Sequence, residues 1–132
     1  MKTQRPITIE HTQPLLTDEI RAKLPQLYVN EALGLQALAQ VKFFTPDSSW
    51  YWYASEGSPV DANGFYDTDK EKVDFFFFGL VMGLEIELGY FALSEMEEAR
   101  GPLGLPIERD EWFKPTTLAK LKEMHERNRG EQ

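Results

Sequence analysis

Alternation of hydrophobic and polar positions predicts strands in the first half of the chain. In residues 40–45, Val41 and Phe43 alternate with polar neighbours, and the aromatic segment 50–54 follows after a turn of Pro, Asp and two Ser residues. A connection this short joins antiparallel strands. We therefore expect a hairpin whose second strand carries both tryptophans on one face and both tyrosines on the other.

Two apolar segments extend the predicted sheet. Residues 75–81 are apolar without alternation, which is typical of a strand covered on both faces, and residues 88–93 follow across a bend at 85–87. The intervening segment 55–74 contains glycines, a proline and many charges, so we expect a solvated loop there. The sheet should then have about four strands.

Capping signals predict short helices before and after these strands. Thr17 precedes a segment with acids in its first turn, and a final helix should begin after Thr116 or Thr117. Between them, Ser94 is followed three residues later by Glu97, which is the spacing of a capping box. In that motif the serine hydroxyl accepts from the glutamate N–H, so we expect Ser94 to start a helix.

These elements predict one α+β domain, a mostly antiparallel sheet with short helices packed on it. A chain of 132 residues, 42% hydrophobic and 27% charged, suits one core. Residues 1–14 contain two prolines and show no period, so we expect a loosely ordered arm followed by a single globular domain over 15–128.

The composition argues against several kinds of catalytic and metal-binding site. The chain has no cysteine, and its two histidines, His11 and His125, lack a second histidine at metal-ligand spacing. Neither a Walker A nor a GxGxxG loop is present. We therefore expect no metal and no cofactor. Residues 1–14 lack a continuous apolar run, so we expect no secretory leader, and the longest apolar run, 75–84, is too short to span a membrane, so we expect a cytoplasmic protein.

The negative charge is concentrated in the middle of the chain. Net charge is −8, yet residues 47–111 alone hold four basic and fifteen acidic residues, while both ends are slightly basic. This balance argues against a protein that neutralises phosphates over a broad surface. An acidic surface could instead compete for a DNA-binding enzyme, and the alternative is that these charges keep the domain soluble.

Two segments in this acidic region are candidates for binding a partner protein. One is a run of acids on the predicted helix after Ser94, and the other is the irregular segment 100–110, which is rich in hydrogen-bonding side chains. The candidate partner-binding residues are Glu95, Glu97, Glu98, Arg100, Arg109 and Asp110. The alternative for the two arginines and the aspartate is a purely structural network of ion pairs.

Two other functions remain open. Exposed rings of Trp50 and Trp52, with Lys114 and the two arginines nearby, would form a nucleic-acid stacking surface; the alternative is that these rings pack in the core. Carboxylate pairs at 85 and 87 or at 95 and 98 could hold a divalent ion for hydrolysis; the alternative is that they are solvated charges.

Several segments together resemble the domain-of-unknown-function family numbered 2958. They are residues 42–47, 50–54, 77–81, 87–91, 100–110 and 113–115. The resemblance covers residues 15 to 118 and departs mainly in the polar loop 56–74. It implies a small bacterial or phage protein carried on mobile elements, in a family without an established reaction. We therefore expect a non-enzymatic accessory protein of a mobile genetic element or phage that binds another protein.

Overall fold

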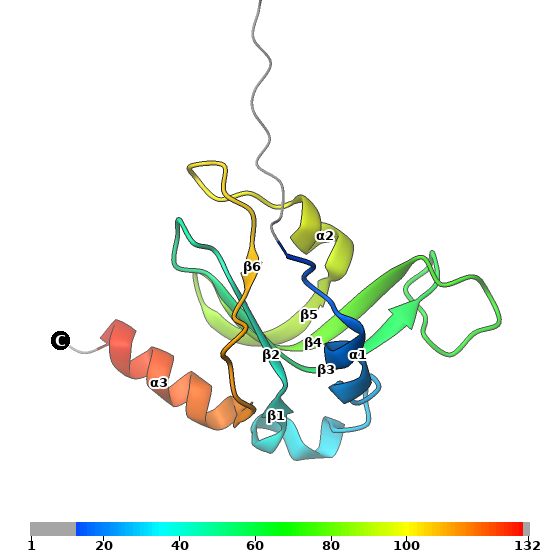
Figure 1. Ribbon diagram of the computed structural model, residues 1–132. Coiled ribbons are helices and arrows are strands. Elements are labelled where there is room, and N and C mark those ends of the chain that lie inside the picture. The colour runs from blue at the N-terminus through cyan, green and yellow to red at the C-terminus, as the bar shows by residue number, and fades with distance from the viewer. Residues whose placement is uncertain (1–12, 131–132) are drawn as a thin grey trace, which may run out of the picture.

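The computed structural model describes residues 13–130 and shows a curved sheet with helices on both sides (Figure 1). The elements are, in order, α1 (Asp18–Lys23), η1 (Glu31–Gln36), β1 (Leu38–Ala39), β2 (Val41–Phe44), β3 (Tyr51–Val60), β4 (Asp74–Met82), β5 (Ile86–Ala92), α2 (Leu93–Glu98), β6 (Glu108–Arg109), β7 (Thr116–Thr117) and α3 (Leu118–Gly130). The predicted α+β class is confirmed. Residues 1–12 of the predicted arm lie outside the described residues.

The main sheet is antiparallel and has five strands in the order β5-β4-β3-β2-β6. It gains one strand over the prediction because the irregular segment forms β6, which pairs with β2 through Phe43 and Phe44. β1 and β7 form a separate two-stranded ladder beside it. The predicted hairpin of β2 and β3 is confirmed, and β5 and β6 are the two edges of the main sheet.

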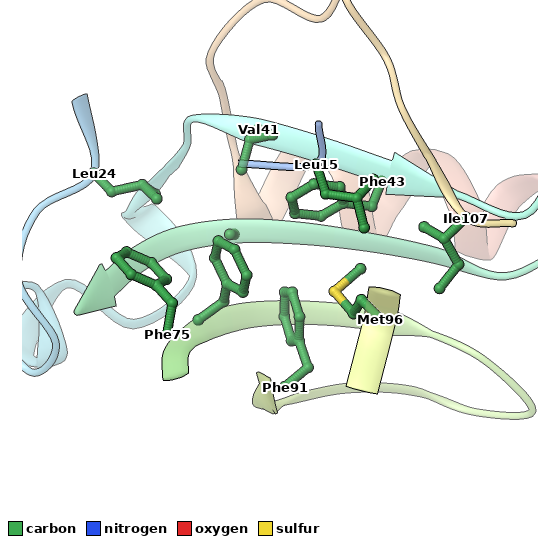
Figure 2. Packing of buried hydrophobic residues seen from close by; sticks show 10 residues of the cluster. Leu15, Leu24, Val41, Phe43, Phe75, Phe91, Met96 and Ile107 are labelled. Atoms are coloured by element: carbon green, nitrogen blue, oxygen red, sulfur yellow. The ribbon is translucent and has the colours of Figure 1, made fainter. Parts of the chain in front are cut away.

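Each face of the sheet carries its own hydrophobic cluster. On one face the cluster includes Val41, Phe43, Phe77 and Phe91, and Met96 of α2 packs on them. Figure 2 shows the phenylalanine rings of β4 and β5 pointing towards the side chains of β2. On the other face, Leu118 and Leu121 of α3 pack on Tyr53, Leu80 and Met82. Cross-strand alternation therefore sorts the aromatic segment as predicted, with Trp52 on the first face and Tyr53 on the second.

Strand β3 is longer than the sequence predicted. Residues 55–60 were expected in a solvated loop, but they belong to β3 and pair with β4 as far as Asp74, and only 61–73 form the loop. A bulge between Ala54 and Glu56 shifts the register by one residue. This shift places Gly57, which has no side chain, against the Phe75 ring, where a Cβ would come within 2.4 Å.

The bulge also directs a carboxylate to a segment that crosses the edge of β3. Glu56 is only 3% exposed, and its two oxygens accept from the backbone N–H groups of Tyr28 at 2.9 Å and Asn30 at 2.6 Å. Ser58 accepts from Leu27 N–H at 3.0 Å. These bonds hold Tyr28 at a φ of 74°, a left-handed conformation that costs a non-glycine residue about 1 kcal/mol.

Two of the three predicted helix caps are present in the structure. Thr17 accepts from Ile20 N–H at 3.2 Å and Thr117 from Lys120 N–H at 3.2 Å, so both predicted caps are confirmed. The cap at Ser94 is wrong. The N-cap of α2 is Ala92, two residues before Ser94, and Ser94 donates its hydroxyl to Asp74 at 2.6 Å, which ties the helix to the start of β4.

The strand after the bend also begins earlier than predicted. Residues 86 and 87 were placed in the bend, but β5 already includes both, and the turn falls at 83–85. Pairing with β4 explains the difference, because Met82 is the register partner of Ile86 and Val81 that of Glu87. β4 itself is covered more completely on the first face than on the second, where Phe76 and Phe78 stay half-buried.

Replacing Glu56 with alanine tests the importance of this carboxylate. The change leaves two backbone N–H groups without their acceptor, so we expect a loss of about 2–4 kcal/mol in the free energy of unfolding, measured by urea denaturation. Glu71→Ala, at an exposed loop position, is the matched control and should change stability by less than about 0.5 kcal/mol. Equal effects of the two substitutions would contradict this role of Glu56.

Candidate functional site

A cleft of about 470 Å³ opens where β2, β3 and the end of β6 meet. Its lining combines charged and aromatic side chains, namely Gln13, Lys42, Phe44, Tyr51, Glu108, Arg109, Asp110, Glu111 and Trp112. Three of the segments that carry the family resemblance, 42–47, 50–54 and 100–110, contribute to this lining. Segments far apart in the chain therefore meet at one place, which makes this cleft the candidate site.

An ion pair crosses the floor of the cleft. The ammonium of Lys42 lies 3.5 Å from a carboxylate oxygen of Asp110, and it also lies 5.2 Å from the centre of the Tyr51 ring and 5.9 Å from that of Phe44. Asp110 donates its own N–H to the Lys42 carbonyl at 2.9 Å. Both the backbone and the charges therefore fix Lys42 and Asp110 relative to each other.

Trp112 stands exposed beside this pair. Its backbone N–H donates to Asp110 at 2.9 Å, which forms a tight turn, while its side chain is 87% exposed. A second hollow of about 360 Å³ adjoins the cleft and shares Lys42, Asp110 and Trp112 with it. Lys114 and Lys120 also line this second hollow. Trp112 thus projects where the two hollows adjoin.

A buried hydrogen bond supports the second hollow from below. The Tyr53 hydroxyl and His125 Nε2 are 2.7 Å apart, which links β3 to α3, and the His125 ring lies 4.9 Å from that of Tyr51. Burial lowers the pKa of His125, and the charges of Arg129 and Lys42 lower it further. Burial also raises the pKa of Tyr53. At neutral pH the pair is therefore an uncharged phenol and an uncharged imidazole.

The predicted arginines have structural partners. Arg109 donates its guanidinium to the Pro14 carbonyl and its backbone N–H to the Gln13 side chain at 2.6 Å, so it fastens the start of the described chain to β6. Arg100 donates to the carbonyls of Glu97 and Ala99 at the end of α2. Of the two arginines, only Arg109 lines the cleft.

The predicted partner-binding residues therefore fall into two groups. Arg109 and Asp110 line the cleft, whereas Glu95, Glu97 and Glu98 are exposed on α2 and are not among the cleft residues. Glu95 also accepts from the N–H of the residue that precedes α2, at 3.3 Å. The candidates came from two segments of the sequence, and only Arg109 and Asp110 line the cleft.

The residues of the nucleic-acid alternative are on opposite faces of the sheet. Trp50 and Trp52 have ring centres 5.8 Å apart, and Trp52 packs against the first cluster. Lys114 lines the second hollow together with Tyr53, on the other face. Trp112, which the sequence prediction did not use, is an exposed aromatic side chain that lines the second hollow together with Lys114 and Lys120.

Residues 13–130 contain neither a metal-binding cluster nor a membrane-spanning helix. Within this range, no three His, Asp or Glu side chains are grouped as a metal ion would require. No helix in the same range is long and apolar enough to cross a membrane.

Comparison with known families settles the affiliation. A family model described as "Protein of unknown function (DUF2958)" matches residues 15–128. The chain belongs to this family. The resemblance found in the sequence is therefore confirmed. No curated protein and no solved structure matches the chain.

The lowered pKa of His125 predicts how stability depends on pH. Between the folded pKa and the unfolded value of about 6.5, the unfolded chain binds more protons than the native state. The free energy of unfolding should therefore be highest above this range and fall as the pH drops through it. Urea denaturation from about pH 8 to pH 5 measures the slope, and His125→Gln should flatten it. An unchanged slope in the variant would assign the effect to other groups.

Proposed function

We propose that this protein is a non-enzymatic accessory protein of a mobile genetic element or phage, and that it acts by binding another protein at the cleft beside Trp112. The observation that carries the proposal is the exposure of Trp112, at 87%, next to a concave surface. Tryptophan, tyrosine and arginine dominate the binding energy of protein interfaces, and Tyr51 and Arg109 line the same cleft.

The ion pair in the cleft supports a preformed binding surface. Lys42 and Asp110 are held by a backbone hydrogen bond as well as by their charges, so little ordering should accompany association. A partner that covers Trp112 would remove a large apolar side chain from water, which is favourable by about 25 cal/mol per Å² buried. The mobile-element setting itself rests on the family resemblance.

The acidic residues suggest what kind of partner would bind. Residues 47–111 carry eleven more negative than positive charges, and Glu95, Glu97 and Glu98 are exposed on α2. Such a surface attracts proteins with a basic, DNA-binding face and speeds their association. The partner we propose is therefore a DNA-processing or defence enzyme, for which this protein would be an acidic competitor.

A second candidate function uses the same hollows. Trp112 lies beside Lys42, Lys114 and Lys120, an arrangement that could stack a base and contact phosphates of a single strand. Asp110 and Glu111 in the adjoining cleft oppose this reading, because they would repel the phosphates. Quenching of tryptophan fluorescence by an oligonucleotide, lost on raising the salt concentration, would favour this candidate over protein binding.

Substitution of Trp112 tests the leading proposal. A photo-reactive amino acid at position 112 should cross-link the partner in cells, and the same group at position 103, where Leu103 is 78% exposed, is the matched control. With the identified partner purified, Trp112→Ala should weaken binding by about 2 kcal/mol, roughly 30-fold, whereas Leu103→Ala should leave it nearly unchanged. Equal cross-linking at both positions would reject the cleft as the binding surface.

Charge reversal on α2 tests the electrostatic part separately. Replacing Glu95, Glu97 and Glu98 with lysine should slow association with the same partner by about tenfold at low salt and less at high salt. The dissociation rate should change little, because rim charges act mainly on encounter. Unchanged association kinetics would show that α2 does not steer the partner.

A further inference from the structure

The far edge of the sheet has features that the cleft does not explain. β5 is the edge strand opposite β6, and among the described residues no strand pairs with its outer side. An edge strand presents unpaired backbone N–H and C=O groups that can pair with another extended chain. Leu84, in the turn before β5, is 90% exposed, and Tyr90 in the strand is 52% exposed.

A hollow of about 460 Å³ lies along this edge. It is lined by Trp50, Val81, Gly83, Leu84, Glu85, Glu87, Gly89 and Tyr90. Gly89 contributes to this space because it has no side chain to fill it. Around the position of a Cβ on Gly89, no atom lies within 4 Å.

The residues that line the hollow are suited to bind a partner's side chain that has an apolar stem and a positively charged end. Trp50 and Val81 provide apolar surface, and the two carboxylates of Glu85 and Glu87 provide negative charge. No lysine or arginine is among these lining residues. Long basic side chains lay their methylene groups on apolar surface and keep the charge at its rim, and a guanidinium also stacks on tryptophan.

We propose that β5 binds an extended segment of a partner protein by strand addition, with an arginine or lysine of that segment in the hollow. Main-chain hydrogen bonds to the edge would provide affinity, and the hollow would select the alternate side chains that face it. This surface is separate from the cleft at Trp112, on the opposite edge of the sheet, so it stands independently of the function proposed for that cleft.

The other face of β5 fits the same partner. Tyr90 lies 4.9 Å from Phe78 and 6.2 Å from Tyr28 between ring centres, so a row of aromatic rings continues from the strand. Burial raises the pKa of Tyr90 to about 12, and the negative charges of Glu56 and Glu31 add to the effect. This face of the edge is thus aromatic, whereas the face with the hollow combines Trp50 with the two glutamates.

Charge decides between a basic partner and a second copy of this chain. Antiparallel pairing of two β5 strands about Gly89 would set Glu87 of one copy opposite Phe91 of the other, and because β5 contains no lysine or arginine, a second copy would bring no cation to the hollow. A net charge of −8 on each copy would oppose the association further. A guanidinium already binds at this turn within the chain, since Arg129 donates to the Gly83 carbonyl at 2.8 Å.

The test uses the full chain and two synthetic peptides. One is a capped peptide of about eight residues in which valine and arginine alternate, and the other replaces each arginine with citrulline, which is neutral but similar in shape. Backbone amide shifts in a nuclear magnetic resonance titration locate the site. The arginine peptide should shift the amides of residues 86–92 and the indole of Trp50, and the citrulline peptide should bind at least about tenfold more weakly.

A pair of double variants separates a specific site from general attraction to an acidic protein. Glu85→Gln with Glu87→Gln should weaken the arginine peptide about tenfold, whereas Glu97→Gln with Glu98→Gln, which changes the net charge equally, should leave affinity within about twofold. Equal effects, shifts centred outside β5, or equal binding of the citrulline peptide would overturn the proposal. Sedimentation showing a dimer that Leu88→Arg dissociates would assign the edge to a second copy instead.

Discussion

The buried carboxylate of Glu56 is the constraint on which the arrangement of the sheet depends. Its two hydrogen bonds hold the segment of Tyr28 and Asn30 against the part of β3 that extends beyond β2. Without this segment, residues 55–60 of β3 would form a further open edge in the middle of the molecule. Because the crossing segment covers this part of β3, β3 and β4 can form a long hairpin. β5 pairs with the outer side of β4 and is therefore an edge strand of the sheet.

This arrangement leaves two open margins with different chemistry. At the β6 margin, charges are paired in the cleft and Trp112 projects between two hollows. At the β5 margin, the backbone edge is open and its neighbouring side chains are aromatic or acidic. The centre of the sheet is covered by apolar clusters on both faces, so it is a rigid support rather than a surface exposed to a partner. The two proposed binding surfaces would therefore lie at opposite ends of the sheet.

Local signals in the sequence predicted the elements, and long-range hydrogen bonds explain the errors. The hairpin and the caps at Thr17 and Thr117 depend on residues within a few positions of each other, so they could be predicted from the chain. Residues 55–60 look like a loop because they contain charge, glycine and proline, yet Glu56 and Ser58 bond to residues about 30 positions earlier. Of the cleft, the sequence identified Arg109 and Asp110. Only one hint of Trp112 was present in the sequence: it is a large aromatic residue outside any alternating pattern, which is where a tryptophan can be exposed in a turn.

The segment 100–110 shows why a high density of hydrogen-bonding side chains does not by itself indicate chemistry. Arg100 and Arg109 donate to backbone carbonyls, and Asp47 accepts from the N–H groups of Leu103 and Leu105, so most of these side chains hold an irregular backbone that cannot satisfy itself. Asp110 likewise accepts from the backbone N–H of Trp112, but its carboxylate also forms an ion pair with the Lys42 side chain in the cleft. Both arginines therefore hold backbone in place, and in the proposed binding surface the contribution of this segment would be Asp110, which lies beside Trp112.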